Sequence, residues 1–264
     1  MPLSEDEIPR FYEECYEPGE EGDKYHRWRE LCALGKADHV ERLVAETGVG
    51  RPKTVADIGC GNGAVLDELG RRDFGDVRVG WEISGSGAEL ARRREGIDEV
   101  GLFDGERIPV RDGAYDLAFA SHVLEHIPDP TRLVSEMLRV ARAVVVEVPL
   151  ENNLSARRPS ARAISEGVGH LQRFDRRQVR ELVTGQGGLV RGELLDPLPR
   201  EIHLFDKTST VARARGTTKW AIRSGAAAIP PLGVRLFTMH FALLAVRPCP
   251  EVAGRPRERI QAAR

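Results

Sequence analysis

The stretch TVADIGCGNG at residues 54–63 decides the fold that this sequence predicts. Its first five residues are mostly apolar, as in a short buried strand, and its last five include three glycines. A glycine-rich turn between a strand and a helix lets the backbone approach a ligand closely and points amide donors toward it. The stretch therefore predicts a strand, a ligand-binding turn and then a helix that starts at Ala64.

Short apolar runs and amphipathic segments alternate along the chain after this turn. Such alternation predicts a mainly parallel sheet with helices on both faces. In this region we expect strands near residues 54–58, 77–83, 101–104, 115–120 and 144–148, and helices near 64–69, 86–94 and 131–139. Outside it we expect helices at 25–47 and 176–183 and strands at 189–195 and 239–246, whereas the pattern assigns no element to 196–238.

The composition of the 264 residues is that of a globular protein, with 41% hydrophobic and 30% charged residues. A formal net charge of -2 gives no general attraction to nucleic acid, and no apolar run is long enough for a membrane span. The four cysteines show no disulfide or metal-ligand spacing, and the acidic N-terminus has no signal-peptide pattern. We therefore expect a cytoplasmic protein with neither a nucleic acid nor a membrane as its partner.

Asp57 separates two interpretations of the glycine turn. Gly59, Gly61 and Ala64 also match the spacing of the dinucleotide-binding fingerprint, and Glu82 stands at a suitable distance for a ribose acid. A carboxylate next to the turn would repel an anionic pyrophosphate, whereas it suits the cationic amine of an amino-acid ligand. Asp57 therefore favours a ligand with an amino-acid end, and a dinucleotide stays as the weaker alternative.

The stretch DIGCGNG at residues 57–63 resembles motif I of the class I S-adenosylmethionine-dependent methyltransferases. Three further stretches are similar to that family in its order and spacing: VGWEIS around Glu82, Phe103-Asp104, and FASHVLEHIPD at 119–129. Residues 147–149 and 170–174 resemble elements after the fifth strand in the small-molecule, methyltransferase type 11-like branch of the family. The resemblance covers about residues 50–185.

The resemblance implies a Rossmann-like, doubly wound α/β fold with strand order 3-2-1-4-5-7-6, the last strand antiparallel, and an N-terminal helical cap. It implies S-adenosyl-L-methionine as the cofactor, with Glu82 on the ribose hydroxyls and Asp104 on the adenine amino group. Ligands of such sheets bind beyond the carboxyl ends of the strands, so the polar residues at these ends should meet at one site. The cofactor-binding residues that we expect are Asp57, Gly59, Cys60, Gly61, Asn62, Gly63, Glu82, Ile83, Phe103, Asp104, Gly105, Ser121 and His122.

His126 is the candidate catalytic residue. Methyl transfer needs alignment of the reactants, and a base where the nucleophile carries a proton; histidine is a natural base near neutral pH. If residues 122–126 are helical, His122 and His126 share one face, with His122 nearer to the cofactor. A packing or capping role is the alternative for His126. The sequence shows no third ligand beside these two histidines, so we expect no bound metal.

The acceptor is expected to meet residues on both flanks of the glycine turn. Residues 150–170 form a long irregular segment, typical of a lid, and the stretch 152–180 is rich in arginine. Arginine forks suit carboxylates and phosphates, so the sequence favours an anionic acceptor; a solvated surface, or pairing with the acidic N-terminus, is the alternative. The substrate-binding residues that we expect are Tyr25, Trp28, His126, Asn152, Arg157, Arg158, His170 and Arg173.

The domain prediction is a helical extension at 1–48 that covers the cofactor site, a methyltransferase domain at 49–250 and a tail at 251–264. The function that we expect is methyl transfer from S-adenosylmethionine to a small-molecule acceptor. The main alternative is a protein of the same fold that binds the cofactor without transferring methyl, as a non-methylating enzyme or a partner subunit. Nucleic-acid methylation is disfavoured because no NPPY- or DPPY-type tetrapeptide follows the fourth strand. The oligomeric state stays open, with a homodimer or a partner-protein complex as alternatives.

Overall fold

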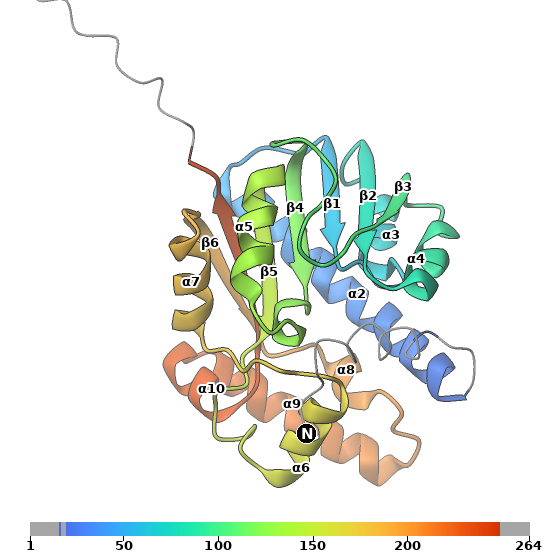
Figure 1. Ribbon diagram of the computed structural model, residues 1–264. Coiled ribbons are helices and arrows are strands. Elements are labelled where there is room, and N and C mark those ends of the chain that lie inside the picture. The colour runs from blue at the N-terminus through green and yellow to red at the C-terminus, as the bar shows by residue number, and fades with distance from the viewer. Residues whose placement is uncertain (1–15, 17–19, 249–264) are drawn as a thin grey trace, which may run out of the picture.

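Seven strands form one sheet, in the order β3-β2-β1-β4-β5-β7-β6, in the computed structural model, which describes residue 16 and residues 20–248 (Figure 1). Strands β1 to β5 pair in parallel, and β7 runs antiparallel to both of its neighbours. This confirms the strand order and the antiparallel last strand. The strands are β1 (Thr54–Ile58), β2 (Val77–Glu82), β3 (Glu99–Leu102), β4 (Tyr115–Ser121), β5 (Ala141–Pro149), β6 (Leu189–Asp196) and β7 (His240–Val246).

Helices cover both faces of the sheet, because β1, β4 and β5 are apolar on both sides. On one face, Val55, Leu117 and Val145 pack with apolar side chains of α2 and α3; on the other, Ile58 and Val144 pack with those of α5 and α7. Both cores lie on the strands that carry the glycine turn, so the turn projects from a rigid frame. The helices with sequence-predicted positions are α2 (Glu20–Thr47), α3 (Ala64–Arg71), α4 (Gly85–Arg92), α5 (Pro130–Val140) and α7 (Arg176–Gly185).

Four further helices lie below the carboxyl ends of the parallel strands in Figure 1 and form a layer of their own. The sequence pattern did not predict them, because they bury few apolar side chains: α9 buries only Gly216 and Arg223, and α6 only Ser165. The segment expected as an irregular lid therefore contains a helix, and the unassigned stretch 196–238 is mostly helical. The four are α6 (Pro159–Gly167), α8 (Arg200–Leu204), α9 (Thr210–Ala227) and α10 (Pro230–Leu236).

Within residues 20–248, no helix has both the length and the apolar character that crossing a membrane requires. The tail that the sequence predicts at 251–264 lies outside the described residues.

Candidate functional site

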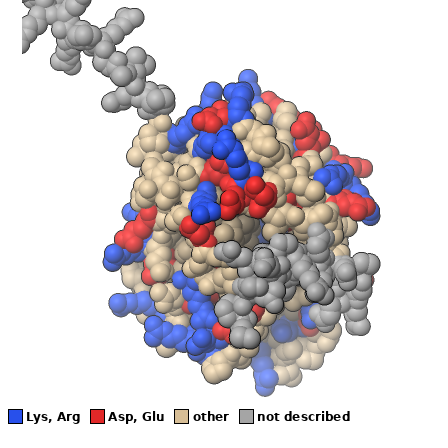
Figure 2. Space-filling view, in the orientation of Figure 1, with Lys and Arg blue, Asp and Glu red and all other residues tan. Residues whose placement is uncertain are grey.

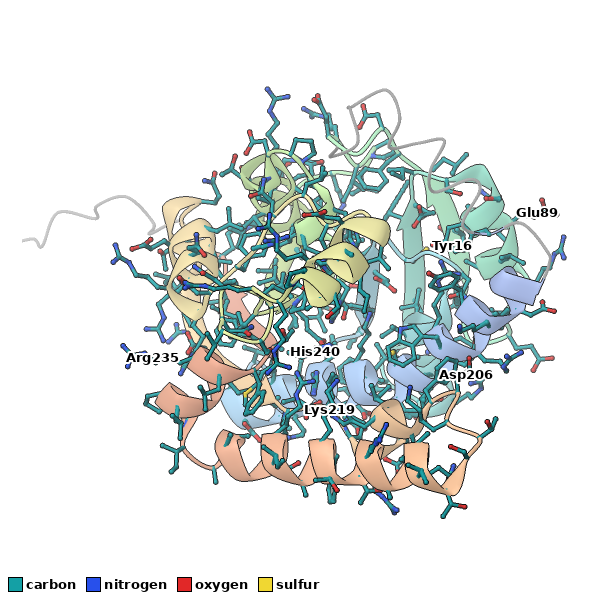
Figure 3. All side chains as sticks on the ribbon, turned by 90° about the horizontal axis from the view of Figure 1, so that it is seen from below. Tyr16, Glu89, Asp206, Lys219, Arg235 and His240 are labelled. Carbon is teal, nitrogen blue, oxygen red and sulfur yellow. The ribbon has the colours of Figure 1, made fainter. Side chains whose placement is uncertain are left out.

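A cavity of about 1990 Å³ opens between the carboxyl ends of the parallel strands and the helical layer below them. Its lining includes the ends of β1, β2 and β4, the inner side of α2, and residues 205–207 between α8 and α9. The strand-end residues that the sequence predicts as one site are thus brought together. Seen from below in Figure 3, Tyr16 and Asp206 lie on the right and His240 lies near the centre.

Glu82 connects the glycine loop to the end of β2. One carboxylate oxygen accepts a hydrogen bond of 2.6 Å from the Gly61 amide, and the other accepts bonds of 3.0 Å from the Ile83 and Ser84 amides. The amides of Gly59 and Cys60 donate to the Trp81 carbonyl at 2.7 and 3.0 Å. Because a carboxylate has about four lone-pair sites, Glu82 can still accept hydrogen bonds from a ligand in the cavity.

Asp57 is only 3% exposed, at the end of β1. Burial raises the pKa of its carboxyl well above the ordinary value; the charge of Lys36 opposes this effect, and that of Glu82 adds to it. Lys36, a residue that the sequence analysis missed, lines the same cavity from α2. A zwitterion with its amine toward Asp57 and its carboxylate toward Lys36 would supply each of these groups with an opposite charge.

Asp104 lies beyond β3, lines the cavity and is exposed. Its Oδ1 accepts hydrogen bonds from the Glu106 and Arg107 amides at 2.8 and 2.7 Å, which lower the pKa of its carboxyl. The turn thereby fixes the side chain and leaves Oδ2 for a ligand. Phe103 and Gly105 line the cavity beside it.

Gly63 is the one predicted cofactor residue of the glycine loop that does not line the cavity. A Cβ at this position would lie 2.5 Å from Ile97 and 3.0 Å from Ala91, so the glycine allows close packing between segments and supplies the positive φ of the α3 N-cap. Gly63 therefore lets α3 pack close to its neighbours, which is one of the three uses of glycines in such loops.

His126 lines the cavity, but residues 122–126 do not form the helix on which a shared face for His122 and His126 depended. His122 has a φ of +60° and only Leu124–His126 form a short 3-10 turn, so the two histidines do not share a helix face. His126 stacks edge-on against His170 with 4.8 Å between ring centroids, and His122 pairs with His240 at 4.2 Å. The positive φ of His122 turns the chain sharply after β4, which the sequence pattern does not signal.

The tautomer of His126 follows from its contact with the Gly169 carbonyl at 3.1 Å. A carbonyl oxygen only accepts, so Nδ1 carries the proton in the neutral ring and Nε2 holds the lone pair. Burial lowers the pKa of His126 below its ordinary value, while the neighbouring Glu125 opposes this effect. The ring is therefore in its basic form at neutral pH.

Four of the predicted substrate residues line the cavity and four do not. Tyr25, Trp28, His126 and His170 belong to its lining, whereas the described positions of Asn152, Arg157, Arg158 and Arg173 lie outside it. Arg157 and Arg158 are exposed, and Arg173 lies 3.4 Å from Glu166. On the face drawn in Figure 2, basic and acidic side chains interleave above the centre, and basic ones gather at the lower left.

Several lining residues were missed because they are remote in sequence from the glycine turn. Trp28 packs edge-on against Phe205 with 5.0 Å between ring centroids, which joins α2 to the segment between α8 and α9. No local pattern predicts this contact, since the two residues belong to elements that meet only in the fold. The missed residues of the lining include Tyr16, Arg29, Lys36, Phe205, Lys207 and His240.

A family model described as a methyltransferase domain matches residues 25–188, which is more than half of the chain. Norajmaline N-methyltransferase of Rauvolfia serpentina is 30% identical over 123 residues, 43% of this chain and 41% of that protein. The matched region thus spans less than half of that relative's length. Geranyl diphosphate C-methyltransferase of Streptomyces coelicolor A3(2) shares the fold, with a TM-score of 0.62 and 16% identity over 94% of this chain and 99% of that one. The [4+2]-cyclase SpnF also shares it, with a TM-score of 0.55 and 17% identity over 80% of this chain and 81% of that one.

Proposed function

The chain belongs to the methyltransferase-domain family, and from this premise we propose that it transfers the methyl group of S-adenosylmethionine to a small-molecule acceptor. The observation that carries the proposal is the convergence of Asp57, Glu82 and Asp104 on one cavity beside the glycine loop. These carboxyl groups match the three polar parts of the cofactor: amino-acid end, ribose and adenine.

Lys36, Asp57, Glu82 and Asp104 line the part of the cavity that we call the cofactor half. This half would bind the cofactor through charged side chains and through a backbone of fixed geometry. Asp57 would bind the cationic amine and Lys36 the carboxylate, so that both charges of the amino-acid end are compensated. Glu82, already held by three backbone amides, would accept the ribose hydroxyls with little loss of conformational entropy. Asp104 would accept from the adenine amino group through Oδ2.

Tyr25, Trp28 and His126 line the part of the cavity that we call the acceptor half. This half would align the acceptor and supply a base. When bound, S-adenosylmethionine supplies a methyl group on a positively charged sulfur. His126 would take the proton of the acceptor nucleophile on Nε2, since Nδ1 is committed to the Gly169 carbonyl. Tyr25 and Trp28 would cover the acceptor with apolar and aromatic surface, which excludes water from the reacting atoms.

The finer proposal concerns the charge of the acceptor, which we propose is anionic. The structural relative from Streptomyces coelicolor methylates geranyl diphosphate, an anion. Lys207 lines the cavity of this chain and offers positive charge to such an acceptor. The arginines at 157 and 158 would contribute only if the segment before α6 moved over the cavity.

The test has two steps, because the cyclase neighbour illustrates that the fold alone does not decide whether methyl is transferred. Mass spectrometry of the ligand that co-purifies should find S-adenosylmethionine or its demethylated product, and a dinucleotide would contradict the cofactor assignment. Methyl-labelled cofactor should then pass its label to a small-molecule extract. Binding without transfer of label to any acceptor would leave a non-methylating protein as the function.

A further inference from the structure

Two histidines and a glutamate from three strand ends meet on the acceptor side of the cavity. His122 follows β4, Glu147 lies near the end of β5, and His240 begins β7. His240 Nδ1 lies 3.2 Å from His122 Nε2 and 3.1 Å from Glu147 Oε1, and the third side of the triangle, His122 Nε2 to Glu147 Oε1, is 3.7 Å. Two imidazole nitrogens and one carboxylate oxygen thus surround a single point.

The sides of this triangle, 3.1, 3.2 and 3.7 Å, are within about 0.2 Å of the edges of one face of a tetrahedral metal site. Histidine nitrogens and carboxylate oxygens bind zinc at about 2.0–2.2 Å, which places adjacent ligand atoms of a tetrahedron about 3.3–3.6 Å apart. We propose that His122, Glu147 and His240 bind one divalent transition-metal ion of the zinc or iron(II) class. Two histidines and one carboxylate are the ligands of such sites, whereas magnesium prefers a shell of oxygens.

Neighbouring carboxylates orient the ligands as in known metal sites. Glu125 Oε1 lies 3.1 Å from His122 Nδ1, which favours the proton on Nδ1 and the lone pair on Nε2, the atom of the triangle. Ser121 Oγ donates to Glu147 Oε2 at 3.1 Å, so Oε1 is the oxygen left to face the histidines. His39 lies 3.2 Å from both Glu147 and Asp196, and holds Glu147 from the side of α2.

Buried negative charge around the triangle favours a cation. Glu125 and Glu147 are at most 1% exposed, and Glu125 faces His122 Nδ1 through Oε1 at 3.1 Å, which leaves much of its charge without a close partner among the described residues. A buried carboxylate without a partner is costly, and a divalent ion nearby would offset that cost. His122 and His240 both line the cavity, so the remaining coordination position faces the acceptor half and can take an oxygen donor.

A second group, Glu125, His126 and His170, lies next to the first, and its ligand atoms also converge. In this group, Nε2 of His126 is the atom that the proposed base reaction uses, since Nδ1 contacts the Gly169 carbonyl at 3.1 Å. The second group also includes Glu125, whose carboxylate lies 3.1 Å from His122 Nδ1. We therefore assign the ion to the first group, and the experiment includes a variant of each.

The experiment is a titration of chelator-treated full-length protein with Co2+, followed by its visible absorption band and by calorimetry, with Zn2+ as competitor. One equivalent should bind and give the intense band of a four-coordinate ion. His240→Gln and His122→Asn should each lower the affinity at least about tenfold. Asparagine is chosen at 122 because it tolerates the positive φ of that residue.

Two variants serve as matched controls. His170→Gln removes a histidine of the second group, and His26→Gln removes a side chain that is 52% exposed; both should bind Co2+ like the parent. Circular dichroism checks the fold of every variant. Absence of stoichiometric binding to the parent, binding unaffected in both ligand variants, or loss only in His170→Gln would overturn the proposal. The readout is metal alone, so its failure leaves the proposed methyl transfer standing, and the reverse holds too.

Discussion

The backbone amide of Gly61 donates a 2.6 Å hydrogen bond to the carboxylate of Glu82. This bond joins the glycine loop after β1 to the end of β2. Gly61 adopts a φ of +57°, which aims its amide at the carboxylate. The cofactor half is thus preorganised by the same two residues that we expect to contact the cofactor.

Gly61→Ala should weaken cofactor binding about tenfold, about 1.4 kcal/mol. An added Cβ would lie 2.6 Å from the Tyr16 hydroxyl, and the positive φ would be strained. Gly48→Ala is the matched control, because Gly48 has a φ of +68° with nothing within 4 Å of the added Cβ. Both variants should lose about 1 kcal/mol of unfolding free energy in denaturant titrations. Equal affinity for S-adenosylhomocysteine in both would argue against a ligand at the loop.

His126→Ala should lower turnover by about 10²–10⁴-fold, the range for removal of a general base. The affinity for S-adenosylhomocysteine should stay nearly unchanged, because the cofactor half does not include this residue. Steady-state kinetics and calorimetry on the same preparation measure both effects. A fall of less than about threefold would mean that alignment alone carries the reaction.

The pH profile tests the same histidine without mutation. Burial lowers the pKa of His126, so the ring that can accept a proton is present at neutral pH and is lost as pH falls through the lowered value. The acid limb of kcat against pH should have its midpoint below 6.5, the ordinary value of the side chain. A midpoint above about 7 would assign the limb to a different group.

Arg157→Gln combined with Arg158→Gln should leave the acceptor KM within about twofold of the parent value, because neither residue lines the cavity. The parent KM should rise with salt if the acceptor is anionic. The acceptor KM of the parent and of the double variant, each measured at low and high ionic strength, distinguishes the effect of the two arginines from the effect of the acceptor's charge. A rise of about tenfold in the double variant would show that the segment before α6 closes over the acceptor.

The three carboxylates of the cofactor half could be predicted from sequence because each lies at the carboxyl end of a strand or just beyond it, whereas Lys36 on α2 could not. Asp57, Glu82 and Asp104 come directly after apolar runs, and the carboxyl ends of parallel strands meet at one edge. The pattern of the strands themselves was equally clear, since β1 and β5 are mostly apolar and mostly buried. Local sequence therefore predicts both the strand and the position of the carboxylate that would contact the cofactor.

The acceptor half could not be predicted in the same way. His240 meets His122 from 118 residues away, and Phe205 meets Trp28 through a segment with little apolar periodicity. Arg157 and Arg158 belong to the segment that the sequence predicts as a lid, yet both residues are exposed and neither lines the cavity. Contacts between remote elements are set by packing, for which a single sequence offers no local signal.

The most direct test of the central claim is calorimetric titration of S-adenosylmethionine into Asp57→Ala and Glu82→Ala. Glu89→Ala serves as the control, since Glu89 is 65% exposed and points outward from α4 in Figure 3. Each site variant should lose about 1.5–3 kcal/mol of binding free energy, the contribution of a hydrogen bond to a charged group, and the control should lose none. Unchanged affinity in both site variants, with the fold intact by circular dichroism, would contradict the assignment of this cavity to the cofactor.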